Sequence, residues 1–215
     1  MTTKQESSGR GTLPDPNKTG VGFKNNNGLQ LQDVLKAGYD PSKRENVTKH
    51  GYNYDSMLSN SNQQVYYNPK ESKLLFNVSG THNLADVGTD VYLALGKLKD
   101  TNRYKEAKNR LKQAKTKYNS NNAVITGHSL GGAVSQYIAS KDDKVYTFNK
   151  GATINQKTRQ NETAYRTEFD PVSLLVSNSK RVKTLPNLEN STGFLGNDLL
   201  KAHSTNTLKN QNIPL

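Results

Sequence analysis

The chain has 215 residues, no cysteine and a formal net charge of +12 at pH 7. This length suits one domain with a proper core, and the lack of cysteine excludes disulfides, thiolate catalysis and thiolate-bound metal. Because the four histidines are scattered, we expect no metal site. No stretch approaches the ~18 apolar residues of a membrane span, and no apolar secretion segment follows the N-terminus. The positive charge favours weak attraction to an anionic surface, without choosing between nucleic acid and phospholipid.

The first 28 residues are rich in Gly, Asn, Thr, Lys and Pro, a composition typical of a segment without regular structure. We therefore expect a basic, poorly structured N-terminal arm over residues 1–28 and one folded domain over residues 29–215. Apolar spacing predicts a first helix within residues 28–40. Two β-rich runs around a polar turn predict a hairpin over residues 64–78, and residues 84–95 predict a helix or part of a mobile lid.

The clearest helical pattern runs from residue 103 to 118, where apolar residues recur every three or four positions and lysines form another face. Such lysines are typical of a solvated face, and a surface that faces lipid or nucleic acid is the alternative. Further strands are predicted at residues 144–149, 163–169 and 180–185. Strands that alternate with helices predict an α/β fold with a mostly parallel central sheet and an antiparallel hairpin on one side.

One stretch, residues 123–132, reads AVITGHSLGG. A β-branched apolar run, then G-x-S-x-G, then a helical pattern is the context of a nucleophile elbow, with an inert serine in a glycine-rich turn as the alternative. Gly127 and Gly131 are small where a side chain would collide with the neighbouring strand and helix, and we expect Ser129 to be exposed. Serine becomes a good nucleophile only when a histidine takes its proton and an acid orients that histidine.

The acid and the histidine follow the serine along the chain in folds that use this elbow. Apart from His128, whose side chain we expect to point elsewhere, His203 is the one histidine downstream of the elbow. Asp170 follows the end of a predicted strand, where a loop presents a carboxylate well. The competing carboxylates are Asp142 and Asp143, which look solvated in a Lys-Asp-Asp-Lys turn, and Glu162, Glu168, Glu189 and Asp198.

An oxyanion hole needs two N–H donors aimed at the tetrahedral intermediate. The residue after the nucleophile, Leu130, supplies one of them. The second is expected from the loop after an earlier strand, and Gly80-Thr81 follows the second arm of the predicted hairpin.

Four separate pieces together resemble the class 3 lipase family over about residues 64–205. They are Gly80-Thr81 after a strand, Asp86 and Asp90 at a helix start, Gly127-His128-Ser129-Leu130-Gly131-Gly132, and Phe169-Asp170-Pro171-Val172-Ser173 with a later His203-Ser204. The resemblance implies an α/β-hydrolase that cleaves carboxylic esters of acylglycerols or phospholipids without a cofactor. It also implies roles for five residues: Ser129 as nucleophile, Asp170 as orienting acid, His203 as general base and acid, and Thr81 and Leu130 as oxyanion donors. The family's lid would correspond to residues 82–95.

The sequence departs from the family at two positions that bear on lid anchoring and substrate class. Ser79 stands where the family often has Arg before the Gly-Thr pair, and Val87 stands where it often has Trp. The lack of a signal peptide and of disulfides favours an intracellular or virus-encoded relative, so a cytoplasmic or virion-associated location is expected over secretion. The apolar segment at residues 194–200 lines an acyl pocket or, as such segments more often do, packs in the core.

The alternative function is a catalytically silent α/β-hydrolase scaffold that binds an anionic partner or serves as a structural component. The basic arm and the lysine-rich helix favour it, whereas a complete Ser-Asp-His set favours the enzyme. Nucleic-acid binding is not expected, because the chain has no recognised nucleic-acid motif. A lipid or phospholipid ester is the expected substrate, with peripheral contact to an anionic membrane surface.

Overall fold

The computed structural model describes residues 28–81, 96–153, 156–187, 201–209 and 211–215. Several predictions concern residues outside these ranges: the arm apart from Gly28, the lid or helix at 82–95, the apolar segment at 194–200, and the carboxylates Glu189 and Asp198.

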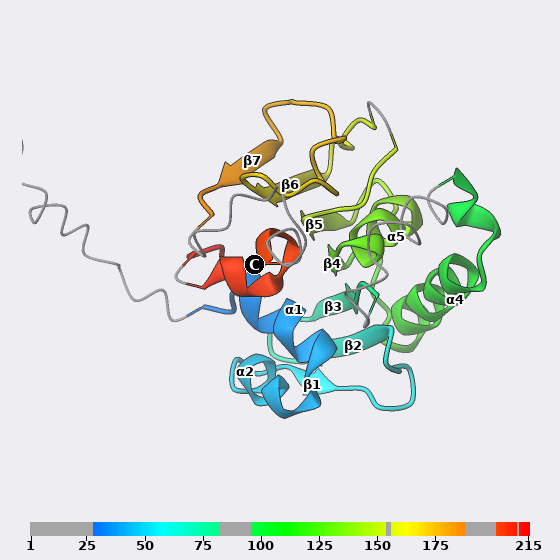
Figure 1. The fold of residues 1–215 in the computed structure, drawn as a ribbon. Helices are drawn as coiled ribbons and strands as arrows, with labels where there is room; N and C mark the ends of the chain where they lie inside the picture. The colour runs from blue at the N-terminus through cyan, green and yellow to red at the C-terminus, as the bar shows by residue number, and fades with distance from the viewer. Residues whose placement is uncertain (1–27, 82–95, 154–155, 188–200, 210) are drawn as a thin grey trace, which may run out of the picture.

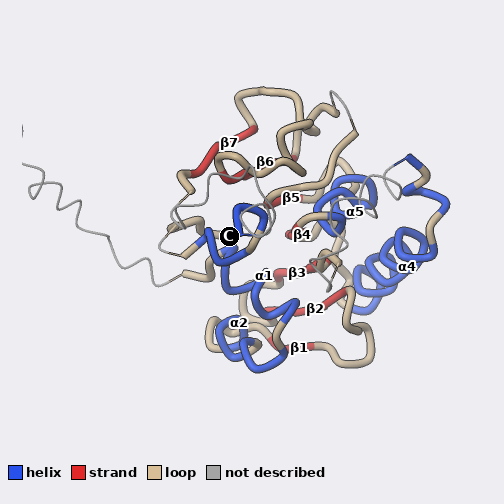
Figure 2. Tube along the Cα trace, viewed as in Figure 1, coloured by secondary structure: helices blue, strands red, loops and turns tan. Residues whose placement is uncertain are grey.

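The core of the fold is one seven-stranded sheet whose strands lie in chain order (Figures 1 and 2). The strands are β1 (Asn53–Tyr54), β2 (Gln63–Asn68), β3 (Lys73–Val78), β4 (Val124–His128), β5 (Lys144–Phe148), β6 (Glu162–Thr167) and β7 (Val182–Leu185). The first three pair antiparallel, and β3 to β7 pair parallel. This confirms the predicted α/β class, with a mostly parallel sheet and an antiparallel hairpin at one side.

The hairpin between β2 and β3 has a clear local cause. The side chain of Asn68 accepts hydrogen bonds from the backbone N–H groups of Lys70 and Glu71, at 3.0 and 3.2 Å. An Asx turn of this kind reverses the chain and sets the register, in which Val65 lies opposite Phe76. The end of β3 is therefore placed beside β4, where the elbow begins.

The described helices are α1 (Leu31–Tyr39), α2 (Glu45–Thr48), α4 (Asn102–Lys117) and α5 (Leu130–Ile138), with shorter 3-10 turns η1 (Pro41–Lys43), η3 (Leu98–Asp100) and η4 (Thr205–Leu208). The predictions of α1, α4 and α5 are confirmed. Thr101 begins α4, because its hydroxyl accepts a hydrogen bond from the N–H of Tyr104 at 3.2 Å. The sequence pattern did not predict α2 or β1, which are too short to carry a period.

The helices lie on both faces of the sheet, as Figure 1 shows with α1 on one side and α4 and α5 on the other. Along β4, Ile125 packs into the cluster that holds the buried faces of α4 and α5, while Val124 packs against the cluster under α1. Successive strand residues point to opposite faces, so one strand serves both layers. Among the described residues, no helix is long and apolar enough to cross a membrane.

Candidate active site

Ser129 occupies a sharp turn between β4 and α5, with φ 56° and ψ −130°. A serine rarely adopts positive φ, and such strain persists only where the surroundings hold it. The Ser129 N–H donates to the carbonyl of Phe148 at 3.2 Å, and its carbonyl accepts from the N–H of Gly151 at 3.0 Å. A Cβ on Gly131 would lie 2.2 Å from the Val78 carbonyl oxygen, so glycine is required where α5 meets the end of β3.

The expectation that Ser129 is exposed is wrong, because only 1% of its surface is accessible. The loop after β3 lies against it. A Cβ built on Gly80 would come within 2.8 Å of the Ser129 Cβ and 2.9 Å of the His128 carbonyl oxygen. The elbow lifts the serine above the sheet, but a neighbouring loop covers it there.

Asp170 and His203 form a buried pair at the same end of the sheet. The His203 Nδ1 lies 2.9 Å from the Asp170 Oδ1, and the two side chains are 1% and 0% exposed. Within the described ranges, the Asp170 carboxylate also accepts from two backbone N–H groups, those of Val172 at 3.3 Å and Ser173 at 3.2 Å. Since a carboxylate accepts and does not donate, the His203 Nδ1 carries a proton, and the neutral tautomer with that proton has its lone pair on Nε2.

The structure does not join Ser129 to His203 by a hydrogen bond. The Ser129 Oγ and the His203 Nε2 are both buried, and neither has a hydrogen-bond partner in the part of the chain that the structure describes. The ring of His203 lies 4.9 Å from that of His128, the residue before the serine. Hydrogen bonds between catalytic groups are often long or poorly aligned before substrate binds. A nucleophile and its base therefore need not be hydrogen-bonded in a structure without substrate.

The two expected oxyanion donors flank the serine. Leu130 is the first residue of α5, and the first N–H groups of a helix have no partner within it. Thr81 follows Gly80, whose backbone packs against Ser129. Both N–H groups therefore belong to segments that meet at the serine.

The competing carboxylates have other partners. The expectation that Asp143 is solvated is wrong: it is buried and pairs with Lys115 of α4, with 2.6 Å between its Oδ1 and the Nζ. Glu162 is buried and pairs with Lys150 at 2.5 Å. Asp142 and Glu168 are exposed. Within the described ranges no group of three or more acids and histidines gathers as metal ligands would.

Sequence reasoning missed a hydrogen-bonded chain that links the loop after β3 to the loop of His203. The Gly80 N–H lies 2.6 Å from the Tyr39 Oη, which is 2.7 Å from the His128 Nδ1. The His128 Nε2 lies 2.7 Å from the His203 carbonyl oxygen. The side chain of His128 thus points away from the nucleophile, as expected, but it holds the backbone of His203.

The Gly80 N–H and the His203 carbonyl, at the two ends of this series of hydrogen bonds, determine which atom donates in each. An N–H group only donates, so the Tyr39 oxygen accepts from Gly80 and the Tyr39 hydroxyl donates its hydrogen to the His128 Nδ1. A carbonyl only accepts, so the proton of His128 is on Nε2. Burial, and then the neighbouring His203, lower the pKa of His128 to about 3, which keeps the imidazole neutral near pH 7.

Two further residues hold the backbone of the site. The Asn149 side chain donates to the Ala202 carbonyl at 3.0 Å, which fixes the residue before His203. Arg103 in the first turn of α4 donates from Nη2 to the carbonyls of Ser79 and Gly80. A guanidinium therefore reaches the Gly-Thr loop although Ser79 replaces the family's arginine. No local sequence signal marks these residues, since tertiary packing alone brings them to the site.

Comparison with known proteins gives one family match. The family model described as "Lipase (class 3)" matches residues 59–165. No curated protein sequence matches the chain.

Solved structures of fungal lipases resemble the chain at low sequence identity. The Rhizomucor miehei lipase propeptide complex is 12% identical with a TM-score of 0.45, over 66% of this chain and 60% of that one. Lip2 lipase from Yarrowia lipolytica is 14% identical with a TM-score of 0.43, over 66% and 72%. Lipase II from Rhizopus niveus is 13% identical with a TM-score of 0.40, over 66% and 71%. The match thus spans about 60% of the length of the Rhizomucor miehei chain.

Proposed function

We propose that the chain, whose residues 59–165 match the family model of class 3 lipases, is a serine hydrolase that cleaves carboxylic esters of lipids through an acyl-enzyme on Ser129. The observation that carries this proposal is the buried Asp170–His203 pair at 2.9 Å, packed against His128, the residue before a serine held at φ 56°. A histidine oriented by a carboxylate next to a strained serine is the arrangement that activates a hydroxyl nucleophile.

In the first half-reaction the Ser129 Oγ attacks the ester carbonyl, and the His203 Nε2 takes the hydroxyl proton. Asp170 keeps the other ring proton on Nδ1 and stabilises the imidazolium that forms. The bond to the leaving alcohol then breaks, and His203 gives its proton to that alcohol. The acyl group remains on Ser129.

In the second half-reaction a water molecule replaces the alcohol. His203 takes a proton from the water, whose oxygen attacks the acyl carbonyl, and then returns the proton to the Ser129 Oγ as the carboxylic acid leaves. The N–H groups of Thr81 and Leu130 stabilise the negative oxygen of both tetrahedral intermediates. A single donor of this kind is typically worth about 10²–10³-fold in kcat.

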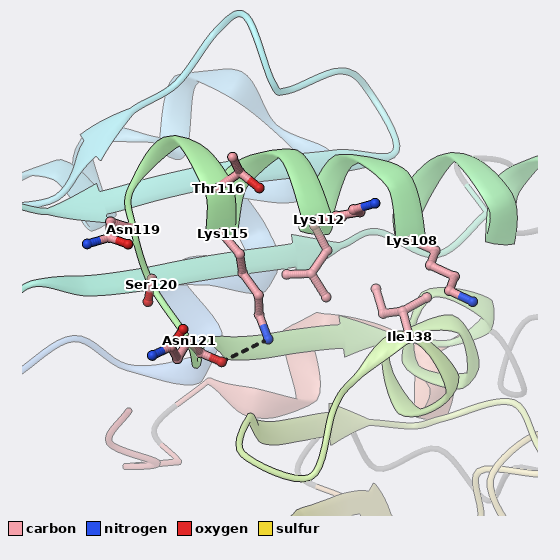
Figure 3. Close-up of a pocket in the computed structure, with 9 residues that line it drawn as sticks. Lys108, Lys112, Lys115, Thr116, Asn119, Ser120, Asn121 and Ile138 are labelled. Carbon is pink, nitrogen blue, oxygen red and sulfur yellow. Dashed lines mark hydrogen bonds between the residues drawn. The ribbon is translucent and has the colours of Figure 1, made fainter.

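A lipid surface with negative charge suits the chain best. The net charge is +12, and α4 carries Lys108 and Lys112 on its exposed face. Figure 3 shows them at an open pocket beside α4, where Lys115 donates to the Asn121 carbonyl at 3.4 Å. Each Lys near an anionic surface contributes about 1 kcal/mol of attraction.

Hydrolysis by purified variants tests the proposed reaction. Ser129→Ala is expected to abolish release of fatty acid from a short-chain ester, since it removes the nucleophile. Asp170→Asn is expected to lower kcat by about 10⁴-fold, because the amide favours the wrong histidine tautomer. The exposed Asp142→Asn is the matched control and should keep full activity. Unchanged turnover in Ser129→Ala would refute the proposal and favour the silent scaffold.

The preference for anionic lipid has its own test. Hydrolysis of phosphatidylglycerol vesicles should exceed that of a neutral triacylglycerol emulsion at low salt, and added salt should remove the difference. The double variant Lys108→Glu with Lys112→Glu should lose the salt-dependent part. Lys141→Glu is the control, because Lys141 is an exposed lysine that lies in a turn outside α4. Equal rates on both lipids at low salt would contradict the preference.

A further inference from the structure

Side-chain hydrogen bonds hold both peptide groups between Ser79 and Thr81, the first at its N–H and its carbonyl and the second at its carbonyl. In the Ser79–Gly80 peptide, the N–H donates to the Tyr39 Oη at 2.6 Å and the carbonyl accepts from the Arg103 Nη2. In the next peptide, the Gly80 carbonyl accepts from the same nitrogen at 2.8 Å. One guanidinium nitrogen thus fixes two consecutive carbonyls at the end of β3.

A fixed carbonyl also fixes the N–H group of the same peptide. A peptide group is planar, and the chain has no cis peptide bond among its described residues. The C=O of Gly80 and the N–H of Thr81 therefore point in opposite directions. Because Arg103 holds the carbonyl, the Thr81 N–H points away from Arg103 and cannot rotate while that contact lasts.

Arg103 is half-buried, and taking part of a charged guanidinium out of water costs free energy. Desolvation lowers the pKa of its guanidinium, and the Glu106 carboxylate, which partly offsets this shift, forms its ion pair with Arg110 instead. Its Nε is buried without a hydrogen-bond partner in the same ranges. A half-buried cation whose described hydrogen-bond partners are neutral carbonyls stabilises a fold poorly. Within the described ranges, its hydrogen bonds all go to the loop that packs against Ser129.

We propose that Arg103 is a positioning residue for ester hydrolysis, which holds the Gly80 carbonyl and thereby aims the Thr81 N–H at the oxyanion formed on Ser129. Tyr39 holds the preceding peptide and keeps the loop in register. This inference rests on the proposed function. It assigns to α4 a part in the reaction that the Ser-Asp-His set does not include.

The test compares Arg103→Ala and Arg103→Lys with the wild type on a soluble short-chain ester. A misplacement of about 1 Å at a reacting group costs about 10²-fold, so kcat of Arg103→Ala should fall by that order. KM should change little, since an oxyanion donor acts in the transition state. Arg103→Lys should be intermediate, because an ammonium keeps the charge but lacks the rigid fork. The matched control is Arg110→Ala, which removes an arginine of the same helix that pairs with Glu106.

Two readouts separate positioning from a purely structural role. Guanidinium ion at millimolar concentration should restore part of the kcat of Arg103→Ala in a saturable way, without a matching change in melting temperature, and should not affect Arg110→Ala. An alkyl boronic acid, which forms a tetrahedral anion on serine, should lose affinity for the variants in proportion to their loss of kcat/KM.

The outcomes are distinct. A folded Arg103→Ala with wild-type kcat and boronate affinity would overturn the inference. If that variant fails to fold, Arg103→Lys decides: a rise in KM at unchanged kcat would overturn it as well. If the wild type neither hydrolyses esters nor binds the boronic acid, the proposed function fails instead.

Discussion

Removal of one hydroxyl, in Tyr39→Phe, tests the chain of hydrogen bonds behind the site. This oxygen accepts from the Gly80 N–H at 2.6 Å and lies 2.7 Å from the His128 Nδ1. Burial raises the pKa of Tyr39, as expected for a hydroxyl inside the protein. The substitution keeps the ring, so packing changes little and the hydrogen bonds are what is lost.

The expected cost follows from the partners that are left behind. The Gly80 N–H and the His128 Nδ1 would each lose a partner, and an unsatisfied buried polar group costs about 1–3 kcal/mol. The two together predict a loss of about 2–6 kcal/mol in the free energy of unfolding. Since Tyr39 keeps some exposed surface, water can satisfy part of the loss, and we expect about 3 kcal/mol.

Tyr66→Phe is the matched control. Tyr66 is fully buried, and its hydroxyl has no hydrogen-bond partner within the described residues. Its removal takes away an unsatisfied polar group, so this variant should be as stable as the wild type or more stable. Urea unfolding followed by circular dichroism measures both variants. If Tyr39→Phe unfolds at the same urea midpoint as the wild type, with the same dependence on urea concentration, the hydrogen bonds of Tyr39 contribute nothing to stability.

Two further predictions concern buried charge. The pKa of His128 is about 3 in the folded protein, below the 6.5 of a free histidine, so the unfolded state binds the extra proton first. The resulting stability is complete above about pH 6.5 and falls as the pH drops toward 3, by a total on the order of 4 kcal/mol; urea unfolding at several pH values should show this loss, and His128→Gln should flatten it. Glu162→Gln leaves the Lys150 ammonium buried without its counter-charge and should cost about 3–5 kcal/mol. Glu71→Gln, at the exposed pair with Lys73, should cost less than about 1 kcal/mol. Equal melting temperatures for Glu162→Gln and Glu71→Gln would contradict a larger role for the buried pair.

Local patterns predict the sheet and its helices well. The β-branched run before Gly127 and the helical pattern after Ser129 define β4, the elbow and α5, because both depend on neighbouring residues. Chain order was also enough to single out Asp170 and His203, which the structure brings within 2.9 Å. Their catalytic roles, with that of Ser129, stay predictions.

The remaining features depend on contacts between distant segments. Asp143 looks solvated in its Lys-Asp-Asp-Lys turn, yet Lys115, 28 positions earlier, packs over it. Ser129 looks exposed at its elbow, yet it is buried, with the loop at Gly80 packed against it. The links made by Tyr39 and Arg103 depend on how α1 and α4 lie on the two faces of the sheet. No periodicity in one segment reports such packing.

Labelling with a fluorophosphonate probe, followed by mass spectrometry of the modified peptide, tests the central claim most directly. We predict that the probe modifies Ser129 in the wild type and that His203→Ala loses this reaction while keeping its fold. His50→Ala, a histidine upstream in the chain, should label as the wild type does. A probe that leaves Ser129 unmodified in the presence of lipid vesicles, or that labels it equally in His203→Ala, would contradict an activated serine at this site.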